Sequence, residues 1–247
     1  MSSLVQSESL KIRGLFTDFQ VELDEHHNRR ERLIKHSRDA TSISKKVIFL
    51  IHRVASEKDQ NTGAAVAHAA KQGLEKLSEV KTIFSKMQGD LSEQNFWRYQ
   101  KNVSPSVQEY IEALSYAHYM ASGRLVSHSE VQMSLCSAEG LPYFPLDYQS
   151  YLLGVSDLSG ELMRLAIVSI AQREHRKQAH DICRFVRSCH ADFERWSDVV
   201  PELDKKQDIT NQNLIKIEGA AYALSIRSSE SGTGLLVSPP DTSSAIC

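Results

Sequence analysis

Four carboxylate side chains occur as two pairs, each on a stretch of sequence with helical character. Glu109 and Glu112 are three residues apart in SVQEYIEALSYAHYM, and Asp157 and Glu161 are four residues apart in YLLGVSDLSGELMRLAIVSI. Residues at these spacings lie on one face of a helix, so each pair can direct its oxygens toward one centre. Magnesium prefers oxygen ligands in octahedral geometry and keeps several waters. The four acids therefore predict a magnesium site.

A magnesium ion held by these acids has a defined chemistry. It polarises a phosphoryl oxygen and lowers the pKa of a bound water, so it can hydrolyse a phosphodiester without a nucleophile from the protein. Arg164 lies on the same helical stripe as Asp157 and Glu161. Its guanidinium is a candidate substrate-binding group that complements a phosphate or steadies the carboxylates.

The second pair lies in a segment with little polar surface. Residues 151–170 are apolar on almost every side, apart from the stripe that carries the two acids. Such a helix is normally buried, and a buried carboxylate needs a positive partner. A metal ion is one such partner, and a salt bridge from Arg164 to Glu161 is the plain alternative. For Glu109 and Glu112 the plain alternative is a solvated helix face.

Other sets of side chains are weaker candidates for a metal site. The histidines of the first predicted helix, including His26 and His52, are expected on the polar surface of a bundle. Neither carboxylate pair supplies the Glu-x-x-His motif of di-iron bundles. A further set has zinc-type side chains without a familiar zinc spacing: His180, Cys183, Cys189 and His190.

Helices must position these side chains, because glycine and proline are too scarce for a fold of many strands and turns. The chain has 11 Gly and 6 Pro in 247 residues. We predict an all-α fold, a single-domain bundle of about seven helices over residues 1–230, with a disordered tail at 231–247. The expected helices cover about residues 10–56, 64–87, 92–122, 129–135, 147–173, 177–196 and 203–226.

Two of these helices have special features. The third is expected to be kinked or interrupted near Pro105, since Ser106 and Glu109 have the spacing of a capping box. The first is very long, roughly 70 Å at the rise of an α-helix. Its core-type positions follow an alternating 4,3 spacing from Ile12 to Val54 but include polar residues in the middle. Either it is a bundle helix with a polar middle, or part of it faces a partner subunit or an internal cavity.

Charge and composition indicate which partners and which cellular compartment to expect. The formal net charge is −2, so no global basic field indicates a nucleic-acid partner. The basic run at 28–38 could contact phosphates, but a solvated face explains it as well. The four cysteines lack a disulfide framework, which favours reduced thiols in an intracellular protein. The apolar runs are too short to span a bilayer, so we expect no membrane association and a cytoplasmic or nuclear location.

Several segments resemble the translin superfamily, and most of all its translin-associated factor X branch. The similarity extends from about residue 15 to residue 230. The patterns QEY-x-EA and G-V-x-DL-x-GELMR are fairly specific to that branch, whereas translin itself lacks this set of acids. The segments that carry the resemblance are residues 22–53, 108–119, 147–164 and 217–230.

The resemblance implies an all-α fold of seven helices and assembly with translin into a hollow hetero-oligomer that holds RNA. It implies a Mg²⁺-dependent endoribonuclease whose first signature holds Glu109 and Glu112 and whose second holds Asp157 and Glu161, with Arg164 at its end. In that family the complex removes nicked passenger strands of small interfering RNA and trims transfer-RNA precursor fragments. Single-stranded or nicked small RNA and silencing-complex components are then expected partners.

The sequence departs from the family pattern in two places, and a non-catalytic alternative stays open beside the resemblance. The loop at 136–146 is short for this family, which we interpret as tolerated surface variation. The basic, nuclear-localisation-like N-terminal extension expected of this branch is missing, so nuclear import is expected to depend on the partner. The alternative is a non-catalytic adaptor or scaffold that stabilises translin and regulates its binding of RNA or DNA. Unchanged cleavage by a complex that carries Glu112→Ala or Asp157→Ala would favour the adaptor.

Overall fold

The computed structural model describes residues 2–56, 62–92, 94–171 and 176–230. Within these ranges the chain forms seven α-helices and no strand, which confirms the predicted all-α fold. The described helices include none that is both long and apolar enough to cross a membrane. The predicted disordered tail, 231–247, lies outside the described residues. The helices are α1 (Ser2–Ser56), α2 (Thr62–Met87), α3 (Asn95–Ser122), α4 (His128–Ser134), α5 (Tyr148–Ala171), α6 (Arg176–Glu194) and α7 (Leu203–Glu230).

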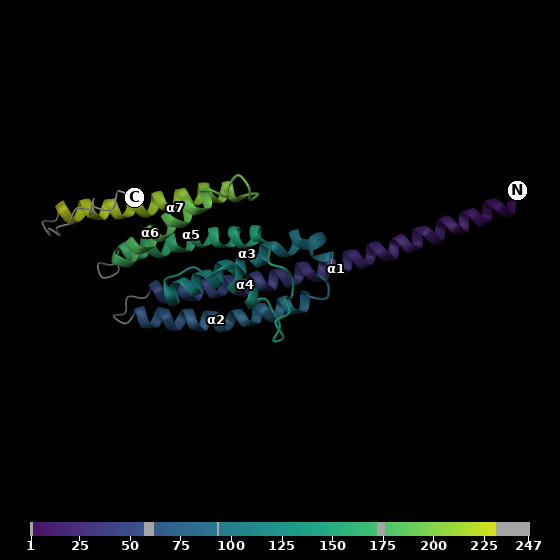
Figure 1. Cartoon of the computed structure of the whole chain (residues 1–247), viewed down its shortest axis with the longest axis horizontal. Helices are drawn as coiled ribbons and strands as arrows, with labels where there is room; N and C mark the ends of the chain where they lie inside the picture. The colour runs from purple at the N-terminus through teal and green to yellow at the C-terminus, as the bar shows by residue number, and fades with distance from the viewer. Residues whose placement is uncertain (1, 57–61, 93, 172–175, 231–247) are drawn as a thin grey trace.

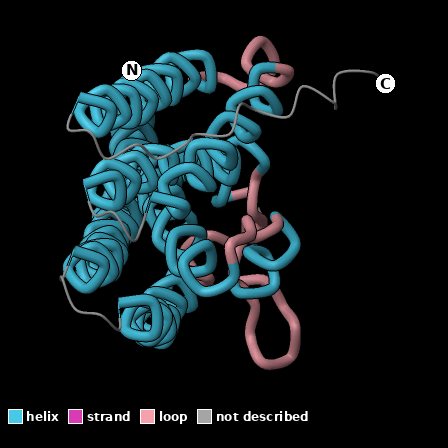
Figure 2. Tube along the Cα trace, turned by 90° about the vertical axis from the view of Figure 1, so that its left-hand side faces the viewer, coloured by secondary structure: helices cyan, strands magenta, loops and turns pink. Residues whose placement is uncertain are grey.

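The long helices lie side by side in layers (Figure 1 and, seen from the end, Figure 2). α1 packs against both α2 and α3, α5 packs on the other side of α3, and α6 and α7 cover α5. One hydrophobic core joins the described helices. Its largest fully buried side chains include Tyr110, Tyr116, Phe84, Leu33, Ile51 and Leu162. Because α3 and α5 lie in the middle layers, the two carboxylate pairs are brought close to one another.

The predicted interruption of the third helix near Pro105 is wrong. α3 runs without a break from Asn95 to Ser122 and contains Pro105. Ser106 is buried inside the helix, and its hydroxyl donates to the carbonyl of Val103 at 2.7 Å, so it caps nothing. An internal proline removes one backbone hydrogen bond, here to the carbonyl of residue 101, and both positions are solvent exposed. Packing of α3 between α1 and α5 outweighs that local cost.

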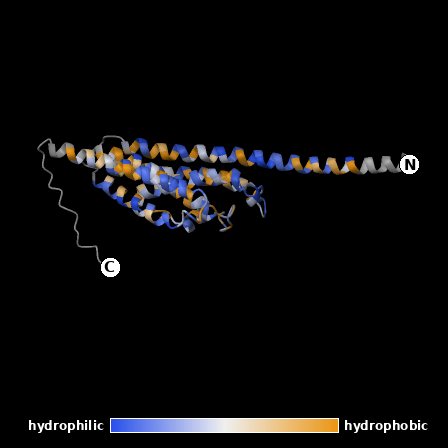
Figure 3. Cartoon of the chain, turned by 90° about the horizontal axis from the view of Figure 1, so that it is seen from above, coloured by the Kyte–Doolittle hydropathy of each residue, from blue (hydrophilic) through white to orange (hydrophobic). Residues whose placement is uncertain are grey.

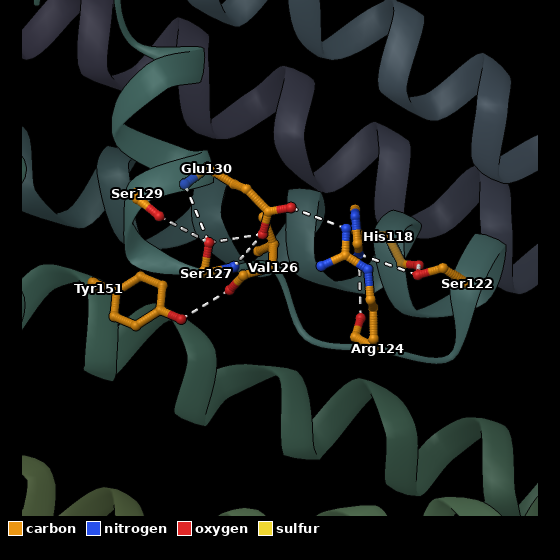
Figure 4. A network of polar contacts seen from close by, with 8 residues as sticks. All are labelled: His118, Ser122, Arg124, Val126, Ser127, Ser129, Glu130 and Tyr151. Carbon is orange, nitrogen blue, oxygen red and sulfur yellow. Dashed lines mark hydrogen bonds and ion pairs between the residues drawn. The ribbon is translucent and has the colours of Figure 1, made fainter.

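A polar network holds the connection between α3 and α5 (Figure 4). Ser127 caps α4, where its backbone N–H donates to Glu130 at 2.7 Å and its hydroxyl accepts from the backbone of Glu130. Arg124 donates to the same carboxylate at 2.9 Å. These bonds lower the pKa of Glu130 to about 2. From α5, the Tyr151 hydroxyl donates to the carbonyl of Val126 at 2.8 Å. The network fixes the start of α5 relative to the end of α3.

The first half of α1 projects beyond the bundle as an arm, and hydrophobic residues recur along it (Figures 1 and 3). The 4,3 spacing predicted for this helix is buried only in its second half, where Leu33, Ala40 and Val47 are fully buried. In the arm, Phe16 is 69% exposed and Leu23 is 66% exposed. A contiguous stripe of this kind on a soluble surface marks an interaction site. The exposed apolar side chains of the arm, residues 12–23, are therefore a candidate interaction surface.

Candidate functional site

All four predicted acids line one cavity. Its volume is about 370 Å³, and α3, α5 and α7 form its walls. Glu109 and Glu112 reach it from α3, and Asp157 and Glu161 from α5. The remaining lining residues are Ser156, Ser159, Gly160, Lys206, Ile209 and Asn213. The structure thus brings together both pairs that the spacing singled out.

A glycine contact sets the distance between the two helices that carry the acids. A Cβ atom at Gly154 would lie 2.8 Å from the backbone oxygen of Gln108 and 2.9 Å from the Cβ of Ile111. Without a side chain at this position α5 can approach the backbone of α3. Asp157 follows Gly154 by about one turn, and Glu112 follows Gln108 by about one turn, so the carboxylates meet beyond the contact.

We expect Gly154→Ala to destabilise the protein by about 1–3 kcal/mol, because the added methyl group overpacks the contact with α3. Urea unfolding of the purified complex measures the change in the free energy of unfolding. Gly219→Ala is the matched control, since nothing lies within 4 Å of a Cβ at that exposed helical glycine. That control should be neutral or slightly stabilising. Equal stability of both variants and the unmodified protein would contradict the close packing.

Glu161 is held by two basic side chains. His52 from α1 contacts it at 2.5 Å through Nε2, and Arg164 lies 3.2 Å from the same carboxylate. The other ring nitrogen of His52 lies 3.2 Å from the Tyr116 hydroxyl, and the two rings stack. Burial and the negative charge of Glu161 raise the pKa of Tyr116, which keeps its hydroxyl protonated. The salt bridge to Arg164 is the plain alternative from the sequence, and it is present.

Two further acids of the cavity pair with lysines. Glu109 lies 3.2 Å from Lys45 of α1, and Asp157 forms an ion pair with Lys206 of α7. Both acids are only partly buried, so these pairs contribute little to the free energy of folding. A cation that competes for either carboxylate therefore displaces a weak partner.

Glu112 differs from the other three acids. Its carboxyl group makes no hydrogen bond or ion pair with any other described residue. Burial raises its pKa to about 8, and the negative charges of Asp157, Glu161 and Glu109 add to the effect. A carboxyl group in this position is protonated at neutral pH when no cation is near. A bound divalent cation would reverse the repulsion and let Glu112 ionise.

The donor set fits magnesium. All candidate ligands are carboxylate oxygens, and the buried hydroxyl of Ser156 on the cavity wall lacks a hydrogen-bond partner among the described residues. In that same part of the chain no three His, Cys, Asp or Glu side chains are already placed to hold one ion together. Magnesium does not require such a cage, because it is usually bound by one or two carboxylates with waters and substrate phosphates. The cavity has room for those waters.

Sequence reasoning missed three of the four basic residues that contact the acids. His52 was expected on the polar surface, yet its side chain is only 19% exposed and contacts Glu161. Lys45 and Lys206 stand in charged stretches of α1 and α7, where nothing distinguishes them from solvated lysines. Their roles depend on which helices pack against α3 and α5. Arg164, predicted to bind substrate, contacts Glu161 while remaining 67% exposed.

The arrangement of the helices matches that of solved structures. The chain has the all-α architecture of the crystal structures of apo-NeC3PO and AfC3PO. Each superposes with a TM-score of 0.62 at 18% identity; the first match covers 85% of this chain and 96% of apo-NeC3PO, the second 86% of this chain and 97% of AfC3PO. At that identity the likeness shows the fold alone.

The chain belongs to the translin family, whose model matches residues 28–228. It is 33% identical over 238 residues to translin-associated protein X of Mus musculus, covering 87% of this chain and 79% of the relative. The translin-associated protein X homolog of Schizosaccharomyces pombe is 24% identical, with 87% and 89% covered. Translin of Mus musculus is 23% identical, with 88% and 94% covered. The expected resemblance to the translin-associated factor X branch is confirmed.

Proposed function

We propose that this chain is the catalytic subunit of a translin-type hetero-oligomer that cleaves RNA with the aid of Mg²⁺. The observation that carries the proposal is the meeting of Glu109, Glu112, Asp157 and Glu161 in one cavity. The similarity to translin-associated protein X supports the assembly. An AfC3PO structure in complex with duplex RNA, with a TM-score of 0.58, supports RNA as the ligand.

In this proposal the four acids hold Mg²⁺. When bound, the ion supplies an activated water and a polarised phosphoryl oxygen. His52 orients the Glu161 carboxylate through the 2.5 Å contact. Lys45 and Lys206, which now pair with Glu109 and Asp157, become free to face phosphate oxygens once those carboxylates turn to a cation. Arg164 is exposed enough to contact the RNA backbone as well.

The substrates proposed for the complex are single-stranded or nicked small RNAs. They include passenger-strand fragments during activation of the silencing complex and fragments of transfer-RNA precursors. Silencing-complex components are then further partners, and the cytoplasm and nucleus are the proposed locations. These proposals rest on the family resemblance.

We propose that a translin subunit binds the arm of α1 and buries its exposed apolar side chains. We expect Phe16→Ser to weaken assembly with translin by about tenfold, because the variant loses the burial of one large apolar side chain. Analytical ultracentrifugation over a concentration series measures the dissociation. Asp18→Ser, an exposed change on the same arm, is the control. Assembly of the Phe16 variant at the strength of the control would show that the arm lies outside the interface.

The function is tested by co-purifying the chain with a translin protein and incubating the complex with single-stranded RNA. We expect cleavage with Mg²⁺ and none after chelation, with translin alone inactive. A specific observation favours the adaptor as second candidate, namely that three of the four acids are paired with basic side chains. An adaptor predicts that the complex binds RNA and that replacing the acids changes neither this binding nor any cleavage by the complex.

A further inference from the structure

A second concave surface lies next to the acidic cavity. It is an open groove of about 670 Å³ between α3 and the second half of α1, two helices that pack against each other. On the α1 side it is lined by Arg38, Lys45, Lys46 and Phe49, and Pro105 of α3 contributes to the opposite wall. From Arg38 to Phe49 the groove extends about 16 Å along the helix axis.

The groove adjoins the acidic cavity through one residue pair, and α1 continues from the groove toward a second acid. Lys45, which lines the groove, lies 3.2 Å from Glu109, which lines the cavity. His52 follows Phe49 by about one turn of α1 and contacts Glu161. A chain-like ligand that crosses the acids can therefore continue along α1 into the groove.

The groove combines a largely apolar wall with cationic side chains, which is the chemistry of a site for a polyanion with flat apolar groups. Arg38 and Lys46 are exposed and form no ion pair with any described residue, and Lys45 has Glu109 as its one acidic partner in that part of the chain. Phe49 is 68% exposed, so its ring is accessible beside these three cations. Grooves that bind single-stranded nucleic acid combine cations along the backbone path with aromatic rings on which bases stack.

We propose that this groove holds a single-stranded stretch of RNA beside the acidic cavity, with phosphates at Arg38 and Lys46 and one unpaired base on the ring of Phe49. The inference rests on the proposed function and deepens it, because it makes an unpaired stretch next to the scissile phosphate the feature that the site selects. A base inside a duplex is already stacked on its neighbours and cannot lie on the ring. A protein helix is the other occupant of such a groove, but unneutralised cations favour the polyanion.

The test is a titration of labelled RNA with the full chain in complex with a translin protein, followed by fluorescence anisotropy. Chelator is present, so binding is measured without cleavage. We expect Phe49→Ala to weaken binding of single-stranded RNA by at least about fivefold and to leave blunt duplex RNA unchanged. The double variant Arg38→Gln with Lys46→Gln should reduce the slope of log affinity against log salt by about 1.4, since two phosphate contacts are lost.

Matched controls lie on other helices. Tyr222→Ala removes a 68% exposed aromatic ring from α7, and Lys71→Gln removes an exposed lysine from α2. Both should bind RNA like the unmodified complex. Unchanged affinity and salt slope in the groove variants would overturn the inference, as would an equal loss on blunt duplex.

Two further results separate this inference from its alternatives. Groove variants that fail to assemble with translin, while the assembled fraction binds RNA normally, would identify a protein interface and overturn the inference. The same samples are then given Mg²⁺ and assayed for cleavage. A complex that binds through Phe49 yet never cleaves would contradict the proposed function and support the groove.

Discussion

Asp157→Asn and Glu112→Gln should each reduce Mg²⁺-dependent RNA cleavage by at least about a hundredfold, with the complex still assembled. The replacements keep the size of the side chains. Asp157→Asn removes a negative charge from the cavity, and Glu112→Gln removes the charge that Glu112 would acquire on binding a cation. A metal ion supplies several kcal/mol of transition-state stabilisation, and each 1.36 kcal/mol is a factor of ten in rate. Single-turnover cleavage of labelled RNA measures the rate.

The control for this pair of variants is Glu75→Gln, a change at an exposed glutamate of α2. It should cleave RNA at the rate of the unmodified complex. Size-exclusion chromatography shows whether each variant assembles. If Asp157→Asn and Glu112→Gln assemble and cleave normally, the chain acts as an adaptor and the acids have a structural role.

The affinity of the complex for Mg²⁺ should rise by about tenfold for each pH unit up to pH 8 and level off above it. The pKa of Glu112 is raised to about 8 by burial and by the neighbouring acids, so cation binding releases a proton below that pH. Isothermal titration calorimetry in buffers of different ionisation enthalpy measures both the affinity and the protons released.

The same raised pKa determines the pH dependence of stability without a cation. Between the ordinary pKa of 4.5 and about 8, the folded chain holds a proton on Glu112 that the unfolded chain has lost. Stability therefore falls as pH rises through that window. Glu112→Gln should flatten both the stability profile and the affinity profile. An affinity that is independent of pH in the unmodified complex would show that Glu112 does not bind the ion.

Much of the candidate site could be predicted because it depends on local spacing. Helical geometry alone places Asp157 beside Glu161 and Glu109 beside Glu112. The contact that brings the pairs together could not be predicted in this way, since Gly154 within a helix indicates only a weak helix former. Glycine is needed there because a Cβ atom would lie 2.8 Å from a backbone oxygen of α3, a helix that is distant in sequence. His52 and Lys206 were missed because their partners are distant in sequence.

Some features of the fold likewise follow from local sequence, whereas others depend on packing between segments that are distant in sequence. The number of helices follows from composition and periodicity, and most of the observed ends lie within a few residues of the predicted ones. Pro105 was assigned to a break because its local effect is unfavourable, whereas packing on two sides keeps α3 continuous. For α1 the 4,3 spacing is the same in both halves, yet only the second half is buried. Sequence periodicity predicts that a helix face is buried, but it does not identify the chain that buries it.

The most direct test of the central claim is a crystal structure of the assembled complex soaked with Mn²⁺, with anomalous scattering recorded to locate the metal. Mn²⁺ takes the oxygen ligands that suit Mg²⁺. The account predicts an anomalous peak within coordination distance of carboxylates from both α3 and α5, including Glu112, with Lys206 displaced from Asp157. A metal-loaded crystal in which the cavity has no peak and Lys206 still pairs with Asp157 would contradict it.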